Sequence, residues 1–335
     1  MVTIRDIAKR AGVSVATVSR TLTTPEAVRP HKRELVQQAV EAMNYVPNAN
    51  ARQLRRRRNE AIIVIVPEIA NPFFSGIVQS IENVAHDLGY RVLIGETQGK
   101  QERLDYYADM VLTRMADGLI LLGSLLPTIV KAELDGGLVQ KIPLVLACER
   151  NEGLDCPTVA IDNVAAGKLA VEHLLARGCR RIATITGPPA NTLSQDRLRG
   201  FSEALLAAGL PTTGAGIVEG DFSIDSGYIA MQGLLDAATV PDGVFCANDE
   251  MAIGAQLAIR ERGLAMPADI AIIGFDDLRF GAFASPPLTT IRQPTTQLGE
   301  TAMRMMDAVL RKLPLEQRNV VLVHELVERQ STAPG

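Results

Sequence analysis

Three side chains near the amino terminus, Val15, Ala16 and Arg20, have the types and spacing needed to contact the edges of DNA base pairs. They fall within TIRDIAKRAGVSVATVSRTL, residues 3–22. Small apolar side chains at the start of a helix can approach thymine methyl groups, and an arginine can donate two hydrogen bonds to a guanine. The pattern therefore indicates a helix that enters a major groove. The alternative is a helical hairpin whose small residues only permit tight packing.

Two short helices joined by a tight turn are expected to position these side chains. Thr3 is suited to cap the first helix, with Asp6 in the reciprocal position of a capping box. Gly12 supplies the backbone freedom that the turn needs, and Ser14 is suited to cap the second helix. Thr3 and Ser14 therefore join the candidate DNA-binding residues. A third helix over residues 31–44 is predicted to close a small three-helix core.

The segment NYVPNANARQLRRRRNE, residues 44–60, is predicted to form a short hinge helix that folds only when docked. Paired with its copy in a minor groove, Leu54 is suited to open a base step while arginines meet phosphates. The alternative is a basic linker. The candidate DNA-binding residues in this segment are Asn48, Ala51, Arg52, Leu54 and Arg55.

Charge is unevenly distributed along the 335 residues. Residues 1–60 hold 12 Lys and Arg against 5 Asp and Glu, whereas the rest of the chain holds 22 against 33. A basic head on an acidic body is typical of a polyanion-binding module joined to a domain with another task. Chance clustering on a solvated face is the alternative. With 47% hydrophobic residues, the chain is long enough for two or three domains.

The four cysteines form no CxxC pair and have no companion histidines at metal-binding spacing, so reduced thiols and no metal or cofactor are expected. The amino terminus is charged and lacks the apolar core of a signal peptide. No apolar run approaches the roughly 18 residues of a membrane span. A cytoplasmic location without a membrane partner is therefore expected.

From residue 61 onward, apolar runs alternate with amphipathic stretches, which predicts parallel sheets with crossover helices. This alternation occurs in two successive series, so two such subdomains are expected, with a ligand cleft between them. The predicted strands are 61–66, 91–95, 118–122 and 143–147 in the first series, and 181–186, 216–220, 243–247 and 270–275 in the second.

Ligand-binding candidates lie at the carboxyl ends of these strands, where open α/β sheets bind ligands. The carboxylate of Asp276 can accept from two vicinal hydroxyls, Arg197 offers a planar set of donors, and Phe222 can stack on a ring. Phe73 and Phe74 are equally suited to core or dimer packing. The full set is Asn71, Phe73, Phe74, Asn191, Arg197, Phe222, Asn248 and Asp276.

Catalytic motifs are not found: the chain has no GxGxxG after the first strand, no GxxxxGK[ST], no HExxH and no GxSxG. An enzyme is therefore not expected, and a sugar-modifying enzyme is a weak alternative. A ligand-binding protein for transport would account for the body but not for the basic head.

The motifs TIRDIAKRAGVSVATVSRTL, NYVPNANARQL, IIGFDD and PPLTTIRQP together resemble the lactose-repressor and galactose-repressor family of bacterial transcription regulators. The resemblance implies an α/β protein with a three-helix helix-turn-helix head and a hinge helix. A periplasmic-binding-protein-like body of two doubly wound parallel-sheet subdomains follows. The implied boundaries are 1–46 for the head, 47–59 for the hinge and 60–335 for the body, with an N-subdomain of about 60–160 and 291–320 and a C-subdomain of about 161–290 and 321–332.

The same resemblance implies roles for individual residues. Thr17 and Ser19 are expected to contact phosphates, in addition to the base contacts and the Leu54 wedge described above. Positions that match Phe74, Arg197, Phe222, Asn248 and Asp276 line the effector pocket in the family. Relatives often have an asparagine three residues beyond Arg20, where this chain has Thr23, and relatives often cap the third helix with Ser or Thr, where this chain has Arg29.

The stretches IVIVPEIANPFFSGI, VLIGETQ, DGLILLGSLLP and GDFSIDSGY resemble the cytidine-repressor branch, which implies a nucleoside effector. A pentose or hexose is the alternative, because sugar-binding relatives use the same carboxylate and arginine. Only STAPG follows the last strand pattern, too short for a coiled coil that joins dimers, so a homodimer is expected. The expected partners are double-stranded operator DNA, a small-molecule effector and a second copy of the chain.

Overall fold

The computed structural model of the chain describes residues 2–45, 59–134, 142–151, 153–212 and 216–333. The chain divides into two compact units, Met1–Asn59 and Glu60–Gly335, which we call the head and the body and treat separately. The predicted hinge helix, with Asn48, Ala51, Arg52, Leu54 and Arg55, lies outside the described residues.

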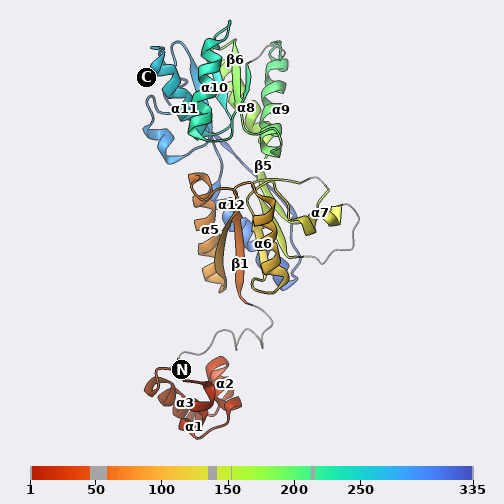
Figure 1. Cartoon of the computed structure of the whole chain (residues 1–335), viewed down its shortest axis with the longest axis vertical. Helices are drawn as coiled ribbons and strands as arrows, with labels where there is room; N and C mark the ends of the chain where they lie inside the picture. The colour runs from red at the N-terminus through yellow and green to blue at the C-terminus, as the bar shows by residue number, and fades with distance from the viewer. Residues whose placement is uncertain (1, 46–58, 135–141, 152, 213–215, 334–335) are drawn as a thin grey trace. The chain divides into compact units, whose positions relative to one another are not determined.

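The head is a small bundle of α-helices around one apolar core (Figure 1). Thr3 and Asp6 form the predicted capping box, and the Ser14 side chain accepts a hydrogen bond from the Thr17 N–H, so both predicted caps are confirmed. Arg29 makes no side-chain cap, and the third helix begins with Pro30, one residue before the predicted start. The elements are α1 (Ile4–Ala11), α2 (Val15–Thr23), the 3-10 turn η1 (Pro25–Ala27) and α3 (Pro30–Ala42).

The body consists of two lobes, each built on a six-stranded sheet covered by helices on both faces (Figure 1). The sheet of the first lobe has the order β11-β5-β4-β3-β1-β2, with α5 and α12 packed together on one face. Its elements are β1 (Ala61–Val66), α5 (Pro72–Leu88), β2 (Arg91–Glu96), α6 (Gln101–Leu112), β3 (Gly118–Leu121), α7 (Thr128–Leu134), β4 (Leu144–Ala147), β5 (Thr158–Ile161), α12 (Thr295–Arg311) and β11 (Asn319–Leu322).

The sheet of the second lobe has the order β12-β10-β9-β8-β6-β7. Helices α8 and α9 pack together, as do α10 and α11, and each pair has its own apolar cluster against the sheet. The elements are α8 (Asn163–Ala176), β6 (Ile182–Thr186), α9 (Thr192–Ala207), β7 (Ile217–Glu219), α10 (Ile224–Asp236), β8 (Gly243–Cys246), α11 (Asp249–Glu261), β9 (Ala271–Asp276), the 3-10 turn η2 (Arg279–Phe283), β10 (Thr289–Arg292) and β12 (Glu325–Val327).

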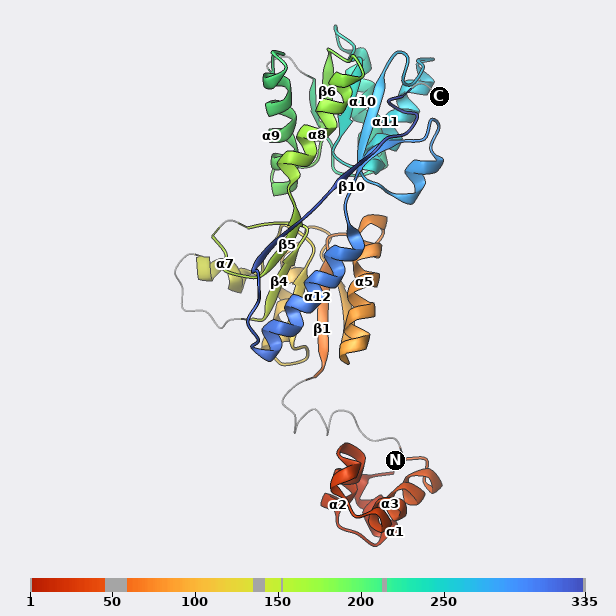
Figure 2. The same cartoon turned by 180° about the vertical axis from the view of Figure 1, so that it is seen from behind.

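The chain passes between the lobes three times, and the connecting segments are visible from behind (Figure 2). It leaves the first sheet after β5, returns after β10 and crosses again between β11 and β12. The described ladders are parallel except that between β12 and β10, where Ile291 lies opposite Leu326 in an antiparallel register. The last strand pattern of the sequence, NVVLVHELVERQ at residues 319–330, thus supplies one strand to each lobe.

Among the described residues, Cys148, Cys156, Cys179 and Cys246 form no disulfide. The described part of the chain also has no helix with both the length and the apolar character of a membrane span, and no cluster of three or more potential metal ligands.

Candidate functional site

Helix α2 presents the side chains that the sequence assigned to DNA bases. Val15, Ala16 and Arg20 are exposed, whereas Val18 is fully buried and packs in the head core. The face of α2 predicted from helical spacing therefore does not pack in the head core. Its small side chains leave the start of the helix accessible.

The hydroxyl groups around the start of α2 are partly engaged within the head. The Oγ atoms of Ser14 and Thr17 lie 2.9 Å apart in a hydrogen bond, and the Thr17 N–H donates to Ser14. Ser19 is half-buried. Thr3 is exposed, but its hydroxyl donates to Asp6 at 2.7 Å. Thr3 and Ser14 therefore hold the starts of α1 and α2 in place.

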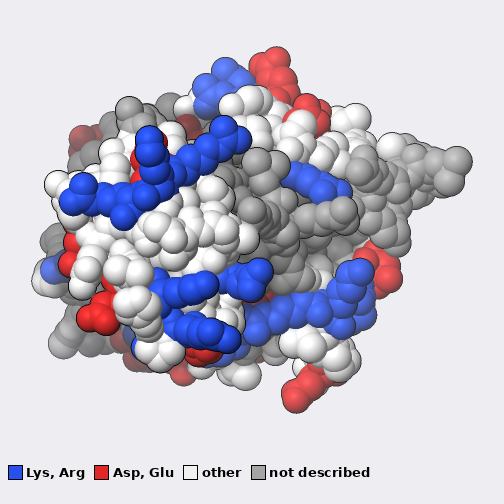
Figure 3. Space-filling view, turned by 90° about the horizontal axis from the view of Figure 1, so that it is seen from below, with Lys and Arg blue, Asp and Glu red and all other residues white. Residues whose placement is uncertain are grey.

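The surface of the head is moderately basic. Residues 2–45 include seven Lys and Arg and four Asp and Glu. Viewed from below, Lys and Arg side chains run in bands across the surface (Figure 3). Six of the seven basic residues are exposed, namely Arg5, Lys9, Arg10, Arg20, Arg29 and Lys32. Such a distribution suits contact with a phosphate backbone.

In the body, a cavity of about 740 Å³ lies between the two lobes, at the carboxyl ends of their strands. Its volume is within the range of small-molecule sites. Residues from both lobes line it, and they include all eight candidates that the sequence analysis named: Asn71, Phe73, Phe74, Asn191, Arg197, Phe222, Asn248 and Asp276. Tertiary structure thus brings together residues that are up to 205 positions apart.

Arg197 on α9 is held almost entirely by the protein. Its Nε donates to Asn163 Oδ1 at 3.0 Å, one terminal nitrogen donates to the Ala247 carbonyl, and the guanidinium lies 3.5 Å above the Phe275 ring. The other terminal nitrogen is 3.9 Å from Asp276 Oδ1. Burial lowers the pKa of Arg197, and the neighbouring Asp276 carboxyl opposes this change. The side chain is therefore a fixed, oriented cation.

Asp276, at the end of β9, is the acceptor beside this cation. Gln293 Nε2, in the connection from β10 to α12, donates to its Oδ1 at 2.7 Å. Burial raises the pKa of Asp276 to about 6, and Arg197 and Gln293 act in the opposite direction. The carboxylate is thus ionised at neutral pH and is tied to a segment where the chain crosses between lobes.

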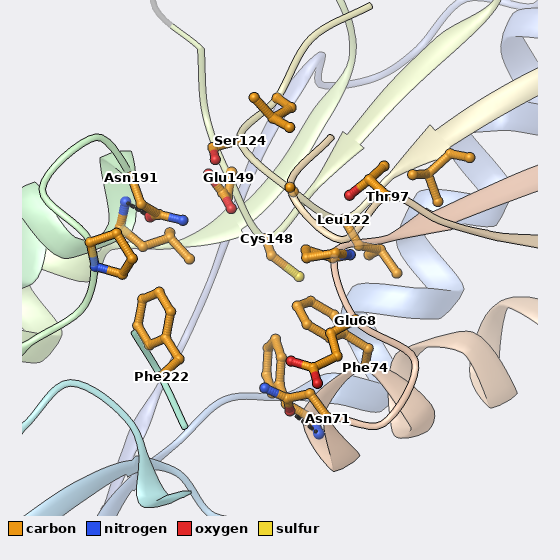
Figure 4. A pocket seen from close by; sticks show the side chains of 18 of the residues that line it. Glu68, Asn71, Phe74, Thr97, Leu122, Ser124, Cys148, Glu149, Asn191 and Phe222 are labelled. Atoms are coloured by element: carbon orange, nitrogen blue, oxygen red, sulfur yellow. Dashed lines mark hydrogen bonds between the residues drawn. The ribbon is translucent and has the colours of Figure 1, made fainter. Parts of the chain in front are cut away.

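Phe222 contributes an aromatic ring from the second lobe, and Phe74 contributes one from the first (Figure 4). Asn248 positions Phe222, because its Nδ2 donates to the Phe222 carbonyl at 2.8 Å. Phe73 is buried in the core of the first lobe, whereas Phe74 is only partly buried. The packing role considered for both phenylalanines thus fits Phe73 better than Phe74.

The three candidate asparagines are helix caps. Asn71, Asn191 and Asn248 occupy the N-caps of α5, α9 and α11, and each side-chain oxygen accepts a backbone N–H at the start of its helix. Each residue also lines the cavity. The amide nitrogen of Asn71 is therefore suited to a ligand, whereas that of Asn248 already bonds Phe222 and that of Asn191 faces Glu149.

Four non-glycine residues of the cavity wall have positive φ: Gln98 (50°), Cys148 (75°), Phe222 (72°) and Asp276 (106°). Non-glycine residues rarely adopt this backbone conformation. Those that do are concentrated at binding and catalytic sites, where the surrounding fold maintains the strain. Their coincidence at one cavity makes it the candidate functional site of the body.

Sequence reasoning missed Cys148 and Glu149, which follow β4 and reach into the cavity (Figure 4). Both are buried, and burial raises the pKa of the Cys148 thiol well above its ordinary value. The predicted strand 143–147 ended directly before them, so the rule that ligands bind at the carboxyl ends of strands was sufficient to find them.

Comparison with known proteins agrees with both parts of the structure. Residues 3–48 match the model of the family described as bacterial regulatory proteins, lacI family, and residues 171–332 match a periplasmic binding protein-like domain. Among solved structures, the lac repressor dimer bound to operator and the anti-inducer ONPF is 30% identical with a TM-score of 0.89, over 99% of each chain.

Curated relatives match along the whole chain. The HTH-type transcriptional repressor CytR of Escherichia coli (strain K12) is 38% identical over 98% of this chain and 96% of its own length. The ribose operon repressor of Halalkalibacterium halodurans is 36% identical over 100% and 98%. These relatives are transcriptional repressors and not enzymes, as the sequence predicted. The chain belongs to the lacI family of bacterial transcription regulators.

Proposed function

We propose that this protein is a ligand-controlled transcriptional repressor that binds a pseudo-palindromic DNA operator as a homodimer. The observation that carries the proposal is the assembly of all eight candidate residues around one cavity, in a chain whose head presents a capped recognition helix. Membership of the lacI family supports the same function. This role places the protein in the cytoplasm with the DNA.

Two parts of the chain contact DNA in this proposal. Helix α2 enters the major groove, where Val15, Ala16 and Arg20 meet bases and Thr17 and Ser19 meet phosphates. The hinge segment reads the centre of the operator through Leu54, flanked by arginines that neutralise phosphates.

The effector that we favour is a nucleoside. Asp276 offers two acceptor oxygens to a ribose diol, and the Phe222 ring offers a flat surface to a base. Similarity to CytR, at 38% identity, supports this branch of the family. The ribose operon repressor, at 36% identity, favours a pentose as the second candidate.

Control of DNA binding is proposed to pass through the three connections between the lobes. Asp276 bonds Gln293 in one of them, and Arg197 bonds Asn163 just after another. A ligand that contacts these residues favours one arrangement of the lobes over the other. The resulting change in DNA affinity equals the ligand's differential affinity for the two arrangements.

Exposed apolar side chains support the homodimer. Strand β2 lies at the edge of the first sheet, where Leu93 and Ile94 are 42% and 49% exposed. In the second lobe, Phe280 and Phe283 of η2 are 61% and 80% exposed. Exposed apolar side chains on an edge strand and on a surface turn are typical of protein interfaces.

A thermal-shift screen of the purified protein against nucleosides, nucleobases and sugars tests the effector class, because a ligand that binds the folded state raises the unfolding temperature. We expect a shift with a nucleoside that is lost in Asp276→Ala. The same ligand is then added to an operator-binding titration, where it must change the affinity.

A shift with a pentose or hexose alone would keep the repressor function and replace the nucleoside. Chemical turnover of any ligand by the pure protein would overturn the assignment as a regulator.

A further inference from the structure

Glu149 is a buried carboxyl group in the cavity wall that bridges the two lobes. It follows β4 of the first lobe and is only 5% exposed. Thr192, at the start of α9 in the second lobe, donates a hydrogen bond to Glu149 Oε2 at 3.1 Å. Figure 4 shows the side chain beside Asn191 at the same helix end. Its position therefore depends on how the lobes meet around a ligand.

The charges around Glu149 leave it balanced between two protonation states. Burial raises its pKa to about 7, although Thr192, Arg197 and Asn191 all favour the ionised form. Of the other groups that face this region, Cys148 remains a thiol because burial raises its pKa well above the ordinary value. Asp276 has a pKa of about 6 and is mostly ionised above pH 7.

Protonation changes what this carboxyl group can recognise. A carboxylate only accepts hydrogen bonds, whereas a carboxylic acid presents one O–H donor next to one acceptor oxygen. An adjacent acceptor and donor on a ligand match this acid with two parallel hydrogen bonds. Cytosine and adenine carry such a pair on their base-pairing edge, whereas ribose offers separate hydroxyl groups.

We propose that Glu149 is a specificity-determining residue that, in its protonated form, pairs with the adjacent acceptor and donor on the edge of the effector's nucleobase. The inference rests on the proposed nucleoside-responsive function. Recognition is then divided between two carboxyl groups in different protonation states. Ionised Asp276 contacts the ribose, and neutral Glu149 contacts the base. The aromatic rings of Phe74 and Phe222 supply the flat surfaces between them.

A definite pH dependence follows. A ligand that binds only the protonated form of Glu149 loses affinity as the pH rises through the pKa of Glu149 in the free protein. With a pKa of about 7 for free Glu149, the protonated fraction and the affinity are expected to fall several-fold, by at most about tenfold, between pH 7 and pH 8. Asp276 is already ionised over this range and adds little to the change.

Isothermal titration calorimetry of the full chain with cytidine, adenosine and ribose, at pH 7 and pH 8, tests the proposal. We expect Glu149→Gln to bind a nucleoside at pH 7 with nearly the affinity of the parent and to lose the pH dependence, because an amide also presents one donor side and one acceptor. Glu149→Ala should bind at least roughly tenfold more weakly.

Glu203→Gln is the matched control, since Glu203 is exposed on α9 and lies outside the cavity wall. It should retain both the affinity and the pH dependence of the parent. Thermal unfolding of each variant establishes that it is folded. Ribose, if it binds, should show neither the pH dependence nor the sensitivity to Glu149→Ala.

The outcomes distinguish a wrong effector class from a wrong role for Glu149. If no nucleoside binds the parent protein, either in the calorimetry or in the thermal-shift screen, the proposed effector class is wrong and the role of Glu149 is overturned with it. If a nucleoside binds but its affinity is unchanged between pH 7 and pH 8, or the dependence persists in Glu149→Gln, only the role of Glu149 is overturned.

Discussion

Single side chains in the cavity combine structural and binding tasks. Asn71 uses its oxygen to cap α5 and retains its amide nitrogen toward the cavity, and the Asn191 oxygen caps α9. Arg197 is similarly fixed by Asn163, Ala247 and the Phe275 ring. Groups already held by the protein lose little conformational entropy when a ligand arrives, so this cavity is pre-organised.

Phe222 keeps its position because Gly187 leaves room for its ring. A Cβ atom at residue 187 would lie 2.1 Å from the Phe222 ring, well inside van der Waals contact. We expect Gly187→Ala to displace the ring and to weaken effector binding roughly tenfold, through lost stacking area. Calorimetric titration with the effector found in the screen measures this change.

Gly233→Ala on α10 is the matched control, because a Cβ atom there meets nothing within 4 Å. This variant should bind as the parent does and unfold at the same or a slightly higher temperature, since alanine favours helix more than glycine. Equal affinities for Gly187→Ala and Gly233→Ala would exclude a contribution of the Phe222 ring.

Among the helices, α2 depends on its cap more than the longer helices of the body do. It has nine residues and buries only Val18 and Thr21. Ser14 supplies the side-chain acceptor for the Thr17 N–H. Short helices are marginal without tertiary contacts, so a single cap is a large share of the stability of α2.

We therefore expect Ser14→Ala to loosen α2 by about 1 kcal/mol, the typical cost of a lost cap. Amide hydrogen exchange in the full chain should become roughly fivefold faster across α2. Ser14→Asn retains a capping oxygen and should exchange like the parent. Unchanged exchange in Ser14→Ala would mean that helix contacts alone hold α2.

The elements themselves were largely predictable. Strand β1 has the predicted bounds, because a run of six buried apolar residues is a strong local signal. Strands β5, β10, β11 and β12 were not separated in advance. Their assignment to one sheet or the other depends on partners distant in the sequence.

For the whole protein, the central expectation is that DNA binding needs two copies and effector binding needs one, because the cavity is formed within a single chain. Ile94→Asp places a charge in the exposed apolar strand β2. We expect it to dissociate the dimer in sedimentation equilibrium and to abolish specific operator binding, while effector binding persists.

Ile217→Asp is the corresponding control, since Ile217 is 45% exposed on β7, the edge strand of the second sheet. That variant should remain dimeric. A dimer that survives Ile94→Asp but not Ile217→Asp would place the interface on the second lobe instead.

The amino-acid sequence by itself determined the order of elements, the helix caps of the head and the set of polar and aromatic residues at the strand ends. These features depend on neighbours within a few positions, so local spacing is enough to predict them. Only the tertiary structure decided that Glu149 is buried against α9, that Asp276 bonds Gln293 and that Arg197 lies over Phe275. Burial and the resulting pKa changes arise from residues far apart in the chain, and no local pattern contains them.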